Sequence, residues 1–263
     1  MELSVFFVWN VLKPAQRMPC EEIIMTKIYN KNKLTFSLIW IGIYVVIASV
    51  ADNLSESIGT AKIITTPLFI IMSIVLIIWV KKNRLTRVFG LTGTVQWNSS
   101  VMYYIPLLIL ITANLWNGVT LNMPIPDTVL YIVSMLFVGF LEELIFRGFL
   151  FKALCESGIK KAFIISSVTF GIGHIVNLVN GADILPTILQ IISAVVIGFL
   201  FTLIYYKTKN LWPCIITHSI FNSLSTFGVE SGVIGRIISC VAICVISISY
   251  SVYLIKSMKE GQN

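Results

Sequence analysis

The chain has 263 residues, of which 57% are hydrophobic and 12% are charged, and its formal net charge is +7. Soluble domains carry about a quarter charged residues, so this composition excludes an ordinary soluble protein and indicates a polytopic membrane protein. The basic residues stand in short clusters between apolar runs rather than on a continuous basic face, which argues against a nucleic-acid partner.

The N-terminal region and the cysteines carry little structural information of their own. Residues 1–33 read as a cytosolic segment without a cleavable signal peptide, and Met1, Met18 and Met25 are each compatible with the true start. The five cysteines are odd in number and form no CxxC pair. Because free thiols in apolar runs pack as small hydrophobes, we expect no disulfide framework.

Apolar segments follow one another along the rest of the chain. Most have the roughly 17–25 residues that a spanning helix needs, and lipid requires backbone groups to be satisfied within the segment, so we expect helices rather than strands. The expected ranges are 34–51, 63–80, 101–116, 128–151, 162–179, 187–206, 211–227 and 233–255. The third is short and compatible with a tilted or partly re-entrant helix. The predicted fold is all-α, with about eight transmembrane helices.

The positions of the basic residues predict the orientation of these helices. If the N-terminus is cytoplasmic and the segments alternate in direction, nearly all of the 19 lysines and arginines fall in cytoplasmic regions. The exceptions are Lys62, Arg147 and Arg236. Since cytoplasmic loops carry an excess of Lys and Arg, we expect a multi-pass protein of the cell membrane with both termini in the cytoplasm.

Ionisable residues inside the apolar segments are the strongest functional signal. Glu142, Glu143 and Arg147 stand in the fourth segment, His174 in the fifth and His218 in the seventh. A charge at the middle of a lipid-facing helix costs roughly 2.5–3.5 kcal/mol, so such residues are expected to form a functional site. Counting residues from the cytoplasmic ends, at about 1.5 Å each, places these groups within roughly 10–18 Å of that surface. We therefore expect one site in the cytoplasmic half of the bilayer.

Helical spacing suggests different roles for these residues. Glu143 and Arg147 are four residues apart and share a helix face, whereas Glu142 points about 100° away and is free to take or give a proton. His218 and Asn222 are also four apart and can reach one oxygen atom together. A structural interpretation stays open, because an intrahelical ion pair and a histidine bonded between helices can serve packing alone.

Three motifs, in this order, resemble those of a known family. Residues 142–147 match EExxxR, residues 170–174 match FxxxH, and residues 218–222 match HxxxN. Together they resemble the CPBP family, also called Abi, of CAAX proteases and bacteriocin-processing enzymes, which includes the type II CAAX prenyl endopeptidase. The resemblance covers about residues 128–225.

The resemblance implies an intramembrane endopeptidase that acts on a membrane-embedded or lipidated peptide or protein. Glu142 and His174 would activate the attacking water, while His218 and Asn222 would stabilise the oxyanion. Supporting residues would hold the geometry and charge of the site: Glu143, Arg147 and Phe170.

The resemblance also raises the question of a cofactor. Some schemes treat these enzymes as metalloproteases, which would place a divalent metal such as zinc on four side chains: Glu142, Glu143, His174 and His218. The sequence has no HExxH motif, and we favour metal-independent water activation by a small margin.

With this core, the chain divides into four expected regions: a cytosolic segment 1–33, three transmembrane helices in 34–127, the catalytic core in 128–225, and the last helix with a short cytosolic tail in 226–263.

Two other classes of function stay open. One is a non-enzymatic membrane factor, such as a bacteriocin immunity or scaffolding protein. The other is a proton-coupled transporter, since buried carboxylates and imidazoles also relay protons. No residue chooses between a prenylated CAAX protein and a bacteriocin or peptide precursor as the substrate, and none identifies the oligomeric state.

Overall fold

The structure is a computed structural model that describes residues 24–92 and 104–260. Within these ranges the chain is helical, and the only strand-like contact is an isolated antiparallel bridge between Val119 and Gly228. The prediction of an all-α polytopic membrane protein is confirmed, because six of the described helices are long and apolar enough to cross a membrane. The predictions on residues 1–23 and 101–103 lie outside the described ranges.

Long helices make up most of the bundle. They are α3 (Lys33–Ile58), α4 (Thr65–Lys82), α6 (Ile125–Glu143), α8 (Ile159–Gly173), α10 (Ile184–Thr208) and α12 (Val233–Glu260). Helix α6 continues without a break through a π-helical stretch, Leu144–Phe151, into α7 (Lys152–Cys155). The shorter helices are α2 (Ile24–Lys31), α5 (Ile105–Ile111), α9 (Val176–Val179) and α11 (Trp212–Leu224).

The third and seventh expected spans are shorter than the others. Helix α11 has 13 residues, a rise of about 20 Å against a hydrocarbon core of about 30 Å. It begins next to Pro213, and a single 3₁₀ turn, Ser225–Phe227, follows it. Helix α5 is likewise followed by a 3₁₀ turn, Ala113–Leu115. Neither short helix is long enough to cross the hydrocarbon core by itself.

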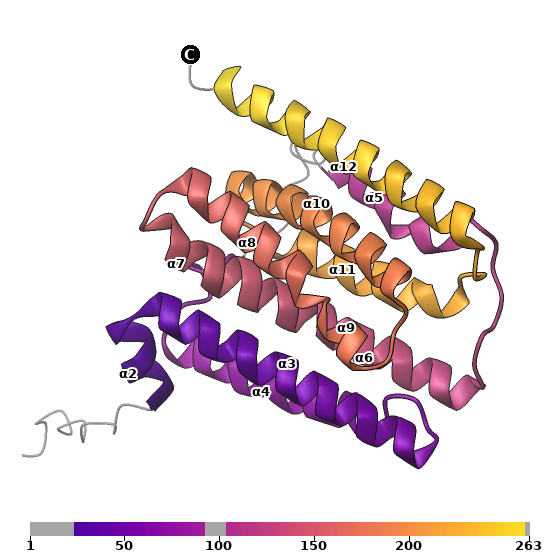
Figure 1. Cartoon of the computed structure of the whole chain (residues 1–263). Helices are drawn as coiled ribbons and strands as arrows, with labels where there is room; N and C mark the ends of the chain where they lie inside the picture. Colours follow the sequence, from indigo (N-terminus) through magenta and orange to yellow (C-terminus); the bar gives the residue numbers. More distant parts are fainter. Residues whose placement is uncertain (1–23, 93–103, 261–263) are drawn as a thin grey trace, which may run out of the picture.

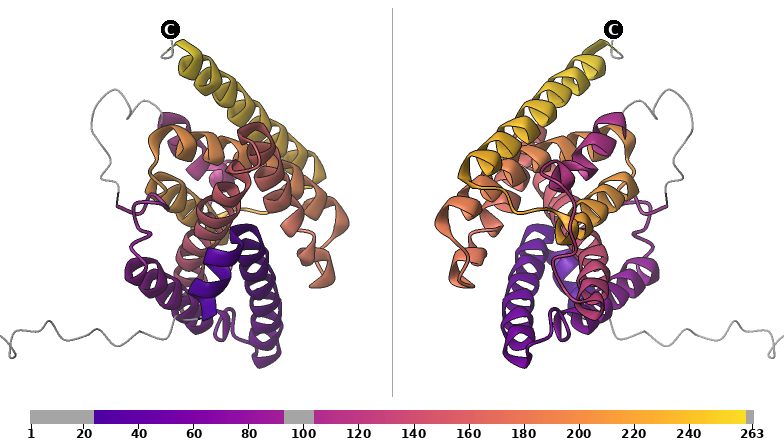
Figure 2. Two further views of the ribbon diagram at one scale, coloured as in Figure 1. Left: turned by 90° about the vertical axis from the view of Figure 1, so that its left-hand side faces the viewer. Right: turned by 90° about the vertical axis from the view of Figure 1, so that its right-hand side faces the viewer.

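Helix α6 and its continuation occupy the middle of the molecule. Helices α11 and α4 both pack against α6, while α10 packs against α8 on one side and α12 on the other. The pair α3 and α4 lies on the side of the bundle opposite α12 (Figure 1), and the end-on views agree (Figure 2). Every residue of the π-helical stretch is buried, so this part of the chain can carry a charged side chain without exposing it to lipid.

Helix α3 is attached to this central helix by aromatic packing. Its Phe36 ring stacks on Trp79 of α4, with 4.9 Å between ring centroids, and meets the edge of Phe149 at 5.1 Å. Side-chain and backbone caps define both ends of α3: the Asn32 side chain accepts from the Thr35 N–H at 2.9 Å, and Gly59, with φ of 79°, closes the last turn. The N-terminal helices are therefore packed onto the core.

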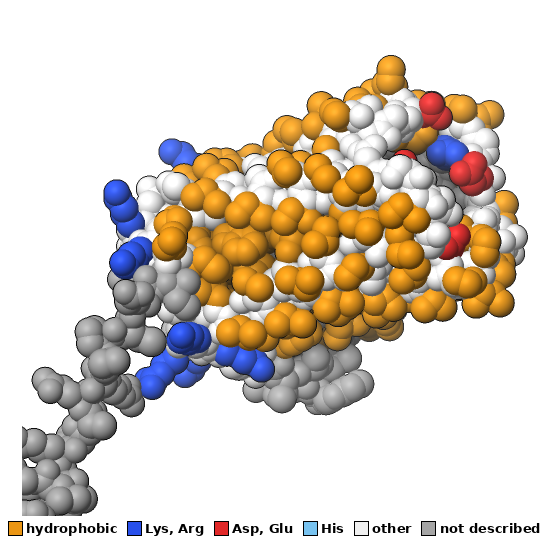
Figure 3. Space-filling view, turned by 90° about the horizontal axis from the view of Figure 1, so that it is seen from below, with side chains coloured by type: hydrophobic (Ala, Val, Ile, Leu, Met, Phe, Trp, Pro, Cys, Tyr) orange, Lys and Arg blue, Asp and Glu red, His pale blue; other side chains and the backbone are white. Residues whose placement is uncertain are grey.

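Charge is separated along the long axis of the bundle. Figure 3 shows most of the lysine and arginine side chains at one end of this face, the acidic side chains together with a basic group at the other, and a broad apolar surface between them. Helix α2 and the C-terminal end of α12 lie at the same end of the bundle (Figure 1). An apolar belt between polar ends is what a bilayer requires, and the basic end is the one expected to face the cytoplasm.

Candidate active site

Glu142 and Glu143 are the last two residues of α6 before the π-helical stretch. Such stretches are rare, and they occur frequently at functional sites because they reorient the side chains of one turn. The sequence pattern alone did not indicate this irregularity. The change of winding falls between the two carboxylates and Arg147, so it helps to set how these groups face one another.

Glu143 and Arg147 form a fully buried ion pair. Arg147 Nη1 lies 3.1 Å from Glu143 Oε1, and both side chains have 0% exposed area. This is the contact that the four-residue spacing predicts. The same Glu143 oxygen lies 2.9 Å from Nδ1 of His218 on α11. One carboxylate oxygen therefore holds an arginine of its own helix and a histidine of a neighbouring helix.

Aromatic rings cover the rest of the Arg147 guanidinium. Its central carbon lies 4.1 Å from the centroid of the Phe170 ring and 5.9 Å from that of Phe201. A desolvated cation over an aromatic face is stabilised by about 2 kcal/mol. Gly198 on α10 leaves the space for this arrangement, because a Cβ there would lie 3.0 Å from Arg147 Nη2. Phe170 is thus a support for the charge; Phe201, which no motif marked, shares that role.

His218 stands between the two glutamates. A carboxylate oxygen only accepts, so Nδ1–H donates to Glu143, and the other ring nitrogen, Nε2, lies 3.6 Å from Glu142 Oε2. Phe170 packs edge-on against the imidazole at 5.8 Å. The ring is therefore oriented by Glu143, with Nε2 directed toward Glu142. Nε2 can donate only when both ring nitrogens carry protons.

Glu142 has a different set of neighbours, as its separate helix face predicts. Its Oε1 accepts a hydrogen bond of 2.6 Å from the hydroxyl of Tyr44 on α3. Its Oε2 has no hydrogen-bond partner within the described residues and is the oxygen nearest to His218. Tyr44 carries no motif and lies 98 positions away in the chain, so sequence reasoning missed it.

His174 lies at a helix end. The expected helix over 162–179 is interrupted: α8 ends at Gly173, His174 follows it, and α9 begins at Val176. His174 Nδ1 lies 3.1 Å from the carbonyl oxygen of Phe170. A carbonyl only accepts, so Nδ1 carries the proton in this contact, and Nε2 of the neutral ring keeps a lone pair that can accept one.

Adjoining cavities bring these side chains together. A smaller cavity of about 250 Å³ is lined by Glu142, Tyr44, His174 and Asn222. A larger cavity of about 550 Å³ is lined by His174, Asn222 and His218. His174 and Asn222 therefore line both cavities, while Glu142 lines the smaller one and His218 the larger one.

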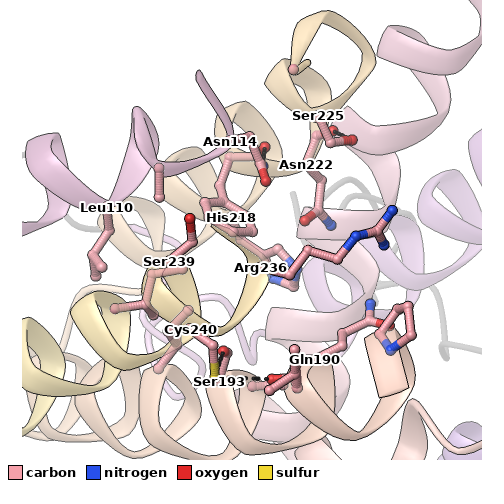
Figure 4. Close-up of a pocket in the computed structure, with 18 of the residues that line it drawn as sticks. Leu110, Asn114, Gln190, Ser193, His218, Asn222, Ser225, Arg236, Ser239 and Cys240 are labelled. Atoms are coloured by element: carbon pink, nitrogen blue, oxygen red, sulfur yellow. Dashed lines mark hydrogen bonds between the residues drawn. The ribbon is translucent and has the colours of Figure 1, made fainter. Parts of the chain in front are cut away.

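The larger cavity extends away from this meeting point between α5, α10, α11 and α12. Figure 4 shows His218 and Asn222 on one wall, with Arg236 reaching across from α12. Polar side chains continue along the other walls: Asn114, Gln190, Ser193 and Ser239. Loop residues 228–231 close the lining at the end of the bundle opposite the basic one (Figure 1). The expectation that the site lies in the cytoplasmic half of the bilayer stays a prediction.

The four side chains proposed for a metal do not fit one in this arrangement. Across the described part of the chain, no three His, Cys, Asp or Glu side chains are placed to share an ion. Glu143 Oε1 is already engaged by Arg147 and His218, and a guanidinium 3.1 Å from that oxygen would repel a dication. We therefore derive no step through a metal.

Comparison with known proteins bears on the same part of the chain. Residues 124–224 match the family model described as type II CAAX prenyl endopeptidase Rce1-like. The chain is also 38% identical over 93 residues to YdiL of Bacillus subtilis (strain 168), a protein named provisionally as a membrane peptidase. The match covers 35% of this chain and 34% of that relative, so the chain spans about a third of the length of the curated protein it matches. No solved structure matches the chain.

The matched region contains every motif residue described above: the two glutamates and the arginine of α6, Phe170 and His174 at the end of α8, and His218 and Asn222 of α11. The order and spacing of these motifs, their shared site and the family match agree. Over residues 124–224, the chain is similar to the type II CAAX prenyl endopeptidase Rce1-like family.

Proposed function

We propose that this protein is an intramembrane endopeptidase that hydrolyses a peptide bond of a membrane-associated peptide or protein. The observation that carries the proposal is the pair of adjoining cavities: His174 and Asn222 line both, Glu142 lines the smaller one and His218 the larger one, and Glu142 Oε2 lies 3.6 Å from His218 Nε2. A carboxylate, two imidazoles and an amide around a polar space inside an apolar bundle are the groups that water activation and oxyanion stabilisation need.

The proposed reaction begins with a water molecule in the smaller cavity. Glu142 Oε2 removes one proton from this water. Nε2 of His174 accepts a hydrogen bond from the other O–H, and the water oxygen adds to the carbonyl carbon of the substrate. The resulting oxyanion faces the Asn222 amide and, when His218 is protonated at both nitrogens, its Nε2–H. The proton held by Glu142 then passes to the leaving nitrogen, the C–N bond breaks, and a carboxylic acid and an amine result.

Glu143 and Arg147 act indirectly in this proposal. Glu143 accepts from Nδ1 of His218 and so sets which nitrogen faces Glu142. Arg147 balances the buried charge of Glu143, and Phe170 supports the guanidinium. A carboxylate that orients a histidine in this way fixes both its tautomer and its rotation.

We propose that the larger cavity receives the substrate. Its volume of about 550 Å³ falls within the range of about 300–1,000 Å³ that is typical of ligand pockets. Its lining combines apolar side chains from α10 and α12 with the amides and hydroxyls named above, as a peptide backbone with apolar side chains would require. The family name suggests a prenylated protein as one substrate class, and a bacterial peptide precursor is a second.

The test compares the wild-type protein with Glu142→Ala in proteoliposomes. The substrates are synthetic membrane-associated peptides, half of them carrying a farnesyl-cysteine, and mass spectrometry detects the products. Loss of a general base is expected to reduce cleavage by about 10²–10⁴-fold, with equal amounts of protein in the membrane. Glu56→Ala is the matched control, because Glu56 is exposed on α3 and lines neither cavity.

Cleavage by Glu142→Ala at the wild-type rate would contradict the proposal. A cellular phenotype that survives both Glu142→Ala and His174→Ala would favour a non-enzymatic membrane factor instead. Substrate flux across the proteoliposome membrane that is lost in Glu142→Ala, without cleavage, would favour a proton-coupled transporter.

A further inference from the structure

Tyr44 connects the N-terminal helices to the proposed site. It lies on α3, outside the region that matches the family, and its hydroxyl donates to Glu142 Oε1 over 2.6 Å. The side chain is buried, with 7% of its area exposed, and its ring stacks on Phe69 of α4 at 5.6 Å. A hydroxyl brought to a catalytic carboxylate on a packed ring has little freedom to point elsewhere.

This hydrogen bond makes the two oxygens of Glu142 different. Oε1 is engaged by Tyr44, whereas Oε2 is buried, has no hydrogen-bond partner among the described residues and lies 3.6 Å from His218 Nε2. A carboxylate held through one oxygen loses most of its rotational freedom about the last side-chain bond. Oε2 is therefore the oxygen available for proton transfer, and its direction is set from α3.

The smaller cavity lies next to Glu142, where the difference between the two carboxylate oxygens affects proton transfer. Tyr44 and Glu142 line it together with His174 and Asn222, and Ser49 and Asp52, further along α3, extend its polar wall. The cavity volume of about 250 Å³ leaves room for water molecules beside Glu142. Helix α3 thus contributes both the wall of this space and the group that orients the carboxylate within it.

We propose that Tyr44 is a positioning residue of the peptidase site, which holds Glu142 through Oε1 so that Oε2 addresses the hydrolytic water. This inference rests on the proposed function, because it assigns a role in the same reaction. Tyr44 acts through Glu142 and does not contact the reacting bond. Its place on α3 makes the N-terminal helices a working part of the site.

The test is Tyr44→Phe, which removes the hydroxyl and keeps the ring. A hydrogen bond to a charged group contributes enough that kcat is expected to fall about 10- to 100-fold, while KM stays within about two-fold because the larger cavity is unchanged. Tyr205→Phe is the matched control. Tyr205 is also buried, donates to the Val88 carbonyl oxygen at 3.4 Å and lines neither cavity, so the kcat of this variant is expected to match wild type.

A second variant separates the hydrogen bond from packing. Tyr44→3-fluorotyrosine keeps a hydroxyl in nearly the same volume and is expected to retain kcat within a few-fold of wild type. Equal losses in the fluorotyrosine and phenylalanine variants would overturn the inference. So would a Tyr44→Phe kcat within two-fold of wild type while Glu142→Ala is inactive, and that result would leave the proposed function intact. If Glu142→Ala cleaves as well as wild type, the proposed function fails and this inference fails with it.

Discussion

Arg147 is the most constrained charged residue of the described core. It is fully buried, its partner Glu143 is fully buried, and Phe170 and Phe201 cover its remaining surface. Moving a charge out of water is costly unless it is paired and packed. Removal of Arg147 would therefore leave the buried Glu143 carboxylate next to His218 without a compensating charge.

At this scale we predict the effect of Arg147→Met, which keeps an apolar stem of similar length. Removal of one partner from a buried pair is expected to lower the free energy of unfolding by about 3–5 kcal/mol, measured by denaturant unfolding in detergent. The control is Lys33→Met, which breaks an exposed pair with Glu156 and should cost no more than about 1 kcal/mol. Equal effects of the two substitutions would contradict the prediction.

Close approach between α6 and α11 brings Glu142 and Glu143 to His218. Gly139 makes this approach possible, because a Cβ at that position would lie 2.2 Å from the hydroxyl oxygen of Ser219 and 2.7 Å from its backbone nitrogen. Small residues at helix contacts in membranes let backbones come together in this way. The distance from Glu143 to His218 therefore depends on a glycine one turn earlier in α6.

We predict that Gly139→Ala forces the two helices apart. Overpacking of this kind lowers the free energy of unfolding by about 1–3 kcal/mol. The variant should therefore remain folded, whereas its cleavage rate should fall because His218 is displaced from Glu143 and Glu142. Thermal unfolding and peptide cleavage on the same preparations would show both effects. Gly42→Ala is the matched control, since nothing lies within 4 Å of a Cβ at Gly42, and it should leave stability equal or slightly higher. Unchanged cleavage by Gly139→Ala would refute the prediction.

At the scale of the whole molecule, the separation of charge implies a single orientation in the bilayer. The basic end carries α2, the start of α8 and the end of α12, and the opposite end carries the loop between α9 and α10 (Figure 1; Figure 3). Positively charged loops stay in the cytoplasm. The division of the chain into regions at residues 33, 127 and 225 stays a prediction, although Tyr44 shows that the second region contacts the third.

Cysteine labelling would measure this orientation. In a chain whose own cysteines are replaced by alanine, Ser157→Cys lies at the basic end, and Ala182→Cys lies at the other end of the same span; both positions are exposed. An impermeant maleimide is expected to label Ala182→Cys on intact cells and Ser157→Cys only after permeabilisation, because lysine and arginine retain their loops inside. The reverse pattern would show that the basic end faces outward.

The lengths of the apolar segments were sufficient to predict the class of fold. The helical spacing of the motif residues was sufficient to predict the contact between Glu143 and Arg147 in the candidate site. Apolar runs must form helices in lipid because their backbone groups have no other partners, and this requirement acts within each segment. The contact between Glu143 and Arg147 is equally local, since four residues bring two side chains onto one helix face. Contacts between helices are different in kind, because they depend on how each helix is rotated and shifted against its neighbours. The Tyr44 hydrogen bond, the place of His218 between two glutamates and the end of α8 at His174 arise from that packing, and no period in the sequence specifies it.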